Sequence, residues 1–561
     1  MTKKDAGIFT RKAVGLVIGL IGVLLLVFII FAVVSRVFRP QDIAVMLPKD
    51  GVVAVMQVSV NSGHEQIQRF YEELNKYELY HPETLKSLLN GALEVDFDKD
   101  ISPWLNRQVG FALVEKQAEK GQVDVLLFFE TKDKNATLEF LKSRGLKTQE
   151  DYLLTTNHNG VDIYRYALSQ TYNFMFVGKY LVVANNEAVL QSVVDSKAKL
   201  KSNPSYQKVS QNLPINNLFF AYTDAGKLID VLKNNEGFMS EKGRELLAFE
   251  PFLKLYKAFG VTAVMENGNL AVQTFTSLDE EYLSGKELIG FDTKFRSNLL
   301  DYASEDVVFY AGGFDLQKQI NRYSDLMSAG GEVSYLIFEG VLQSQKDKYL
   351  GQEIDLNEDV YPLLQGEYAF LVNKNDQNES VSVILELADP LRDRDKIESI
   401  VDSFVRKSAI LAPKVVEVEL EDGTKMQEIQ TVPEEISRST ENYKGYEINV
   451  LTVGTNTWGF YYIIIDNVLV ISTHQSQIHA SIDLFEDSGK SLKNGNVFRE
   501  SISPVIRTTD EILYFDLGYA LNKIGFMPEL FAGYLEPFKS IGSGTNYFKD
   551  GISSIHYIKI D

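Results

Sequence analysis

Three aspartates at alternate positions have the spacing of metal ligands. Asp96, Asp98 and Asp100 match the first three ligand positions of a calcium-binding loop. Such a loop also needs a glycine at its sixth position and a glutamate at its twelfth, where this sequence has Ile101 and Arg107. The pattern excludes an EF-hand and leaves two interpretations. In the first, the aspartates form a looser cation site and are the candidate metal ligands. In the second, they form a solvated turn whose last carboxylate caps the following segment.

The sequence contains no recognisable catalytic motif. It has no cysteine, so a thiolate nucleophile and a disulfide framework are both excluded, and it has no G-x-S-x-G nucleophile elbow. The closest pair of histidines is five residues apart, which is off the spacing of a zinc site on one helix face: the six are His64, His81, His158, His474, His479 and His556. We predict no catalytic residue and no cofactor. A hydrolase assembled from distant residues is the alternative.

An apolar segment near the N-terminus has the length of a transmembrane helix. Residues 13–34 carry no charged or strongly polar side chain. A helix of this length covers about 33 Å, which is enough to span a bilayer core. A cleaved signal peptide has a shorter apolar region and a small-x-small cleavage site, which Ser35 and Arg36 do not supply. We therefore expect an uncleaved, single-pass transmembrane anchor at residues 13–34.

Charges give this anchor an orientation. More basic side chains precede it than follow it, namely Lys3, Lys4, Arg11 and Lys12 before it and Arg36 and Arg39 after it. We expect residues 1–12 to be a cytoplasmic tail and the rest to be extracytoplasmic. The net charge of −21 argues against a nucleic-acid partner. Gly15 and Gly19 have the spacing of a helix-dimerisation motif, but glycine is common in membrane helices, so homodimerisation is the less favoured interpretation.

The remaining chain contains an internal repeat. Asp96, Asp98 and Asp100, followed by Pro103, return 259 residues later as Asp355, Asn357 and Asp359, followed by Pro362. The apolar run at 111–114 then returns as 369–372. Four further landmarks match in order: 51–53 with 306–308, 179–183 with 467–471, 218–220 with 512–514, and a strand ending at 279 with one ending at 561. We predict two tandem homologous domains, at 44–280 and 300–561.

Each copy is predicted to be α+β, with mainly antiparallel sheets. Alternating strands are interrupted by amphipathic helices, and short turns at Gly178 and at Asn267 favour hairpins. The second copy is longer between Phe404 and Gly445, where we expect an added hairpin. Three strand pairs should hold equivalent places in the two copies: 111–114 with 369–372, 181–183 with 469–471, and 218–220 with 512–514.

Two short motifs resemble a known family. The run Leu47-Pro48-Lys49-Asp50-Gly51 before a strand, and the later run from Asp100 to Leu105, follow an N-terminal anchor, as in a bacterial family of uncharacterised extracytoplasmic proteins, domain of unknown function 3352. The second copy departs from the pattern, because Leu363 stands where the first has Trp104. The resemblance implies a protein of the bacterial envelope and supplies no activity or site residues.

The sequence thus favours a non-enzymatic binding or structural protein of the cell envelope. Its tandem domains would bind a protein or an envelope polymer. A carrier of lipids or other apolar ligands is an alternative, indicated by 28 tyrosines and 34 phenylalanines, and it would require an apolar cavity within or between the copies. An envelope hydrolase is the third interpretation.

Overall fold

The computed structural model describes most of the chain after its first 41 residues. The described residues are 42–60, 64–93, 96–116, 122–145, 152–167, 172–234, 253–279, 281, 294–329, 332–350, 351–374, 379–408, 411–419, 425–433, 436–453, 458–487, 490–506, 509–523 and 533–561. The predicted anchor at 13–34, with Gly15 and Gly19, lies outside them.

The chain divides into two compact units. The first runs to Asp279 and includes Phe526–Phe538 and Ile560–Asp561, and the second comprises Glu280–Gly525 and Lys539–Lys559. Within the described residues, no helix combines the length and the hydropathy needed to cross a membrane.

The first unit is built on an antiparallel sheet. In order across the sheet its strands are β10 (Asn269–Leu278), β9 (Tyr256–Glu266), β8 (Phe219–Asp224), β1 (Val52–Ser59), β2 (Leu105–Glu115), β3 (Val123–Thr131), β7 (Tyr180–Ala184), β6 (Asn173–Val177), β5 (Val161–Tyr166) and β4 (Leu153–His158). Its helices are α2 (Glu65–Leu74), α3 (Pro82–Leu93), α4 (Lys134–Gly145), α5 (Glu187–Asp195), α6 (Pro204–Gln211) and α7 (Ala225–Lys233). The predicted antiparallel architecture is confirmed.

Tight turns fix the register of these hairpins. Between β9 and β10, Asn267 and Gly268 both have positive φ, of 51° and 76°, as a type I′ turn requires. Gly178 has a φ of 58° between β6 and β7. Both turns stand where the sequence predicts them, because glycine and asparagine enter the left-handed region at low cost.

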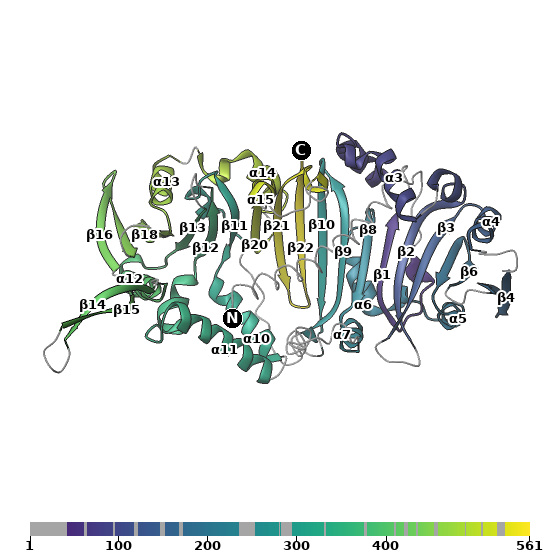
Figure 1. The fold of residues 1–561 in the computed structure, drawn as a ribbon, viewed down its shortest axis with the longest axis horizontal. Coiled ribbons are helices and arrows are strands. Elements are labelled where there is room, and N and C mark those ends of the chain that lie inside the picture. Colours follow the sequence, from purple (N-terminus) through teal and green to yellow (C-terminus); the bar gives the residue numbers. More distant parts are fainter. Residues whose placement is uncertain are drawn as a thin grey trace. The chain divides into compact units, whose positions relative to one another are not determined.

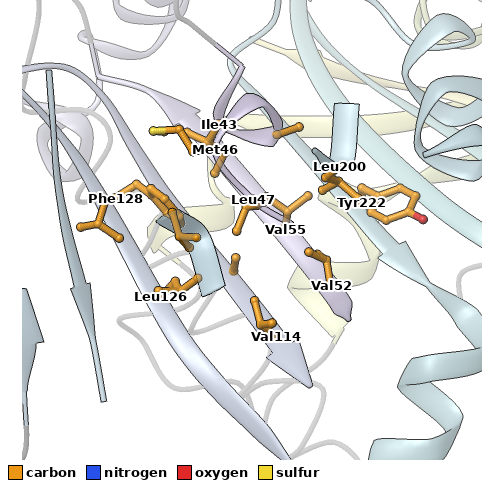
Figure 2. Packing of buried hydrophobic residues seen from close by; sticks show 14 of the residues in the cluster. Ile43, Met46, Leu47, Val52, Val55, Val114, Leu126, Phe128, Leu200 and Tyr222 are labelled. Atoms are coloured by element: carbon orange, nitrogen blue, oxygen red, sulfur yellow. The ribbon is translucent and has the colours of Figure 1, made fainter. Parts of the chain in front are cut away.

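One face of this sheet forms the core of the first unit. Leu126 and Phe128 on β3, Val55 on β1 and Tyr222 on β8 are 2% exposed or less. They pack with the short helix η1 (Ile43–Val45) and with Met46, Leu47 and Leu200, as Figure 2 shows. α6 packs on β9 and β10 from the same side. The contact is close at Gly260 of β9, where an added Cβ atom would meet Leu213, just beyond the end of α6. The sheet therefore has one face that is closed by helices.

The second unit has the same kind of sheet. Its strand order is β22 (Gly551–Ile560), β21 (Phe538–Phe548), β20 (Glu511–Asp516), β11 (Val307–Phe314), β12 (Glu367–Asn373), β13 (Ser380–Glu386), β19 (Val468–Ser472), β18 (Trp458–Ile465), β17 (Tyr446–Val453) and β16 (Ile436–Tyr443). Its helices are α10 (Leu316–Ala329), α11 (Glu332–Tyr349), α12 (Pro390–Ser408), α13 (Gln475–Glu486), α14 (Asn496–Ile502) and α15 (Leu517–Lys523) (Figure 1).

The two strand orders correspond position by position. β2 and β12 each lie beside the central strand β1 or β11, β8 and β20 lie on its other side, and β7 and β19 each lie next to β3 or β13. The three strand pairs singled out in the sequence thus hold the same places in the two orders. The longer stretch of the second unit forms β14 (Leu411–Glu419) and β15 (Lys425–Pro433), an antiparallel pair in a sheet of its own.

A buried polar side chain stands at matched positions in the two units. Gln108 lies three residues before Phe111 on β2, and Glu367 lies three residues before Phe370 on β12, each 1% exposed. The Gln108 amide donates to Gln57 Oε1 over 3.2 Å, and that oxygen accepts the N–H of Ile43. The Glu367 carboxylate accepts the N–H groups of Asn298 and Leu299, over 3.2 and 3.3 Å. Glu367 thereby binds the start of the short 3₁₀ helix η5 (Leu299–Asp301) directly, whereas Gln108 is linked to the start of η1 through Gln57.

Glu367 can ionise and Gln108 cannot, which predicts that the stability of the second unit depends on pH. Burial raises the pKa of Glu367 to about 8, and the two backbone N–H groups offset only part of that effect. Because the pKa is higher in the folded than in the unfolded chain, the contribution of Glu367 is complete below its ordinary pKa and is lost as the pH rises through about 8. Glu367→Gln should therefore stabilise the chain by about 3 kcal/mol at pH 9 and by little at pH 4.

Urea unfolding of the full chain in a nonionic detergent, at several pH values, measures this effect. Gln108→Glu is the matched control, because it should introduce the same loss of stability at high pH into the first unit. The prediction would be contradicted if the free energy of unfolding of Glu367→Gln fell as steeply with rising pH as that of the wild type.

The first unit includes residues that come far later in the chain. The Tyr80 hydroxyl donates to the carbonyl of Tyr534 over 2.6 Å, and the Tyr80 ring makes edge contacts with Tyr534 and Phe538. Tyr80 is 3% exposed. Helix η2 (Glu78–Tyr80), which carries this tyrosine, thus packs against Tyr534 and Phe538 of the same unit.

Candidate functional site

The three candidate metal ligands lie on one turn. Asp96 caps the single π-helical turn η3 (Phe97–Ile101) by accepting the N–H of Lys99 over 3.2 Å, and it pairs with the Lys99 ammonium over 2.7 Å. The Asp100 carboxylate accepts the N–H of Asp96 over 2.9 Å. Asp98 pairs with Lys86 over 3.2 Å. The carboxylates are brought together along the chain, but each is engaged by a backbone N–H or a lysine.

The same turn recurs in the second unit. Asp355 caps the turn η6 (Leu356–Val360), and the Asp359 carboxylate accepts the N–H of Asp355 over 2.9 Å, the distance found in the first unit. Lys99 has no counterpart there, since Glu358 takes its place. Among the described residues, no group of three histidine, aspartate or glutamate side chains has the arrangement of a metal site. This repeated capping geometry supports the structural interpretation of the aspartates.

An apolar surface lies on the second face of the sheet in the second unit. Strand alternation places Tyr310, Ala369, Leu371, Ile512 and Tyr514 in the core, each 3% exposed or less. Their neighbours point to the opposite face and form two rows across β13, β12, β11, β20 and β21. The first row is Val383, Phe370, Ala311, Leu513 and Ser543, and the second is Val381, Val372, Phe309, Phe515 and Ile541. We call these two rows the apolar face of unit 2.

Several side chains of this face are open to solvent. Phe370 is 39% exposed, Val381 is 52% exposed and Leu513 is 36% exposed. The neighbouring part of the same face is covered, because Leu385, Tyr368 and Leu469 pack with Ile397 and Val401 of α12. An antiparallel sheet with one wet face normally alternates apolar and polar residues, but no residue of these two rows is charged. Such a surface is typical of a binding site.

The first unit carries matching rows. Leu127, Phe111, Met56, Ala221 and Val261 form one row, and Val125, Leu113, Ala54, Thr223 and Phe259 form the other. Phe259 is 36% exposed. Near β8, β9 and β10 this surface is hollowed by about 300 Å³, and the hollow is lined by Ala221, Thr223, Phe259, Gly260, Val261, Thr274 and Thr276. Apart from threonine, its side chains are apolar.

A polar group of residues borders the apolar face of unit 2. Glu511 lies on β20 two residues before Leu513, so it points to the same side. The Tyr547 hydroxyl donates to Glu511 over 2.9 Å, and the Arg322 guanidinium lies 4.7 Å from the centre of the Tyr547 ring. Burial raises the pKa of Glu511 and of Tyr547 and lowers the pKa of Arg322. These residues come from α10, β20 and β21, and no local sequence pattern links them.

A second, polar hollow of about 450 Å³ opens in the first unit. It lies between the Pro48-Lys49-Asp50 motif and the C-terminal half of α5, and its other lining residues are Ala188, Gln191, Ser192, Asp195, Ser196 and Ala198. Asp195 is engaged there by His158 over 2.8 Å and by Asn159 over 2.6 Å. These contacts fasten the β4–β5 turn to α5. The motif thus forms the wall of a wide, shallow hollow.

Sequence reasoning missed the apolar face, although a signal for it exists. The run Val307–Phe314 and residues 368–372 of β12 are apolar at both sets of alternating positions. An antiparallel strand with one solvated face would be polar at every second position, so continuous apolar runs indicate a strand that is covered on both sides or binds something. The polar group at Glu511 had no such signal, because Arg322 and Tyr547 are 225 residues apart.

Comparisons with known proteins give a family and no assigned activity. No curated protein matches the chain. A solved structure described as "Structure of crystal form III of TP0453" is 13% identical, covers 45% of this chain and 83% of its own, and has a TM-score of 0.23. Crystal form I of TP0453 is 12% identical, covers 45% and 82%, and has the same TM-score. The family model described as "Protein of unknown function (DUF3352)" matches residues 12–413, which confirms the resemblance noted in the sequence. The chain belongs to this family of proteins of unknown function.

Proposed function

We propose that this protein is a non-enzymatic, membrane-anchored protein of the bacterial envelope that binds an apolar ligand on the open faces of its two sheets. One observation carries the proposal, which is the apolar face of unit 2. Phe370, Val381 and Leu513 remain 36–52% exposed on a surface without charged residues. Burying such side chains stabilises a complex by about 25 cal/mol per Å² of apolar surface, so the face gains most from an apolar occupant.

Further features support the same proposal. The first unit has equivalent rows and a hollow of about 300 Å³ on them, which fits two homologous copies that share one binding mode. The anchor predicted at 13–34 would tether the two units to a bilayer, with the N-terminus in the cytoplasm and both units outside it. An apolar ligand fits these observations better than an envelope polymer, whose hydroxyl groups would find few partners on the rows.

A photoactivatable, clickable alkane tests this function. Added to membranes that contain the full chain, the probe should label peptides from β11, β12 and β20. Phe370→Asp and Leu513→Asp should each lower that labelling at least tenfold, since a charge on the floor of the site costs on the order of 1.4 kcal/mol or more of binding free energy. Leu391→Asp is the matched control, because Leu391 is 87% exposed on α12, away from the rows, and should leave labelling unchanged.

The opposite result would reject the function. Labelling spread evenly over surface peptides of both units, or labelling that Phe370→Asp and Leu513→Asp leave at the wild-type level, would show that the rows bind no apolar ligand. Melting temperatures of the variants, measured on the same preparations, separate lost binding from lost folding.

A further inference from the structure

The apolar face of unit 2 continues into a third row, which begins at Leu385 on β13 and carries polar groups from Tyr368 onward. Gly313 pairs with Tyr368 on one side and with Glu511 on the other, and Glu511 pairs with Thr545. Strand alternation places this row on the same side of the sheet as Ala311, directly beside the first apolar row. Gly313 leaves room for the Tyr368 hydroxyl, because a Cβ atom at position 313 would lie only 2.7 Å from that hydroxyl.

Helix α10 closes this row with further polar groups. The Tyr368 hydroxyl donates to Gln319 Oε1 over 2.8 Å, and Arg322 donates to the carbonyl of Phe548 over 3.1 Å. Gln319 is 5% exposed and Arg322 is 3% exposed. Glu511 is less buried than these two and accepts the Tyr547 hydroxyl. An apolar floor thus ends at a set of fixed hydrogen-bonding groups, an arrangement that orients a ligand with one apolar and one polar end.

The first unit shows that the fold does not require these polar residues. The equivalent third row there consists of Phe129, Val109, Val58, Phe219 and Ala263. All five side chains are apolar, although the strands pair in the same order. Burying a polar group costs free energy unless it makes hydrogen bonds. The presence of buried polar side chains in the third row of unit 2 alone therefore points to a role in binding.

Charge restricts the polar end of the ligand. Arg322 faces the ring of Tyr547 and the carbonyl of Phe548. Lys294 is held by Asp510 over 2.9 Å and by Asn546 over 3.1 Å. Glu511 is the carboxyl group beside the apolar rows. Burial and the neighbouring Asp510 raise its pKa, whereas the hydrogen bond from Tyr547 and the charge of Arg322 lower it. Arg322 and Glu511 offset each other's charge, so this end of the site carries no net charge that would bind an anionic head group. A hydroxyl group can donate a hydrogen bond to an ionised Glu511 and accept one from Tyr547.

We propose that unit 2 holds a neutral amphiphile, with an acyl chain on the apolar face and an uncharged, hydroxyl-bearing head group at Glu511 and Tyr547. This inference rests on the proposed function and adds the chemical class of the ligand. The first unit, with three apolar rows, takes the chain portion of such a molecule without selecting its head.

Photolabelling of the full chain in membrane vesicles at pH 7.5 tests the inference. Three probes carry the same diazirine-bearing chain, as an alkane, a monoacylglycerol and a free fatty acid. Peptides from β11 and β20 should be labelled at least fivefold more by the monoacylglycerol than by the fatty acid. Glu511→Gln should reduce that ratio to below twofold by raising the labelling by the fatty acid, which is a gain of signal that misfolding does not produce. Glu500→Gln, an exposed glutamate on α14, should leave the ratio unchanged.

The outcomes separate the two proposals. Equal labelling by the monoacylglycerol and the fatty acid in the wild type, or a preference that Glu511→Gln leaves intact, would overturn the assignment of a neutral amphiphile while labelling by the alkane upholds the proposed function. Loss of alkane labelling at the rows would overturn both.

Discussion

Gly542→Ala is expected to lower the free energy of unfolding by about 3 kcal/mol, because the added methyl group has no space. Gly542 lies on the core side of β21, where a Cβ atom would meet the backbone of Ser501 on α14, with the carbonyl carbon only 2.6 Å away. The helix backbone cannot rotate out of the way as a side chain can. α14 would have to move off the sheet, taking Phe498 and Ile502 out of the core.

The matched position in the first unit provides a graded control. A Cβ atom at Gly260 would meet the side-chain ends of Val209 and of Leu213, the latter at 2.9 Å, and these can shift. Gly260→Ala should therefore cost only about 1–2 kcal/mol. Gly340→Ala should raise stability by about 0.5–1 kcal/mol, since nothing lies within 4 Å of that position in α11. Urea unfolding of the full chain gives the three values, and a Gly542→Ala protein as stable as Gly340→Ala would show that α14 does not pack as described.

Trp104→Ala is expected to cost about 3–5 kcal/mol, the largest loss among the variants considered. Trp104 is 4% exposed and packs against Phe129 and Phe140, with ring centres at 6.2 and 5.5 Å. Its indole N–H donates to the carbonyl of Asp100 over 2.7 Å, so the same substitution releases the η3 turn. Hydrogen exchange of peptides from β2 and α4, with urea unfolding of the full chain, measures the loss.

The second unit supplies the control for this variant. Leu363 occupies the matched place and is 5% exposed, so leucine is accepted there in an equivalent fold. Trp104→Leu should cost less than about 2 kcal/mol and should leave exchange in α4 nearly unchanged. If Trp104→Leu and Trp104→Ala were equally destabilising, volume would not be the cause, and the hydrogen bond to Asp100 would carry the effect.

The sequence predicts the elements of this fold better than its binding surface, for a physical reason. Turns such as Asn267-Gly268 and apolar runs such as 181–183 and 469–471 are local signals, because the backbone conformation and burial they require depend on neighbouring residues. The acidic turns at Asp96 and Asp355 are equally local. In the first of them the Asp100 carboxylate accepts the backbone N–H of Asp96, a contact that the spacing of the aspartates alone does not specify.

The proposed binding surface depends on which side chains are left without a covering element, and that information is not local. Phe370 and Leu371 are both apolar, yet one is 39% exposed and the other 2%. Only the sheet and the helices beside it decide which of the two is covered. Glu511, Tyr547 and Arg322 meet because three distant segments do, so no spacing rule could have placed them together.

The return of the chain to its first unit has a consequence for biogenesis. A polypeptide is made from its N-terminus, and domains generally fold in that order as they emerge. Tyr80, 3% exposed in the finished protein, is packed against Tyr534 and Phe538, which are synthesised only after nearly all of the second unit. Until then its ring has its contact with Phe70 but lacks those with Tyr534 and Phe538. The packing of the first unit is therefore completed only when nearly the whole chain has been made.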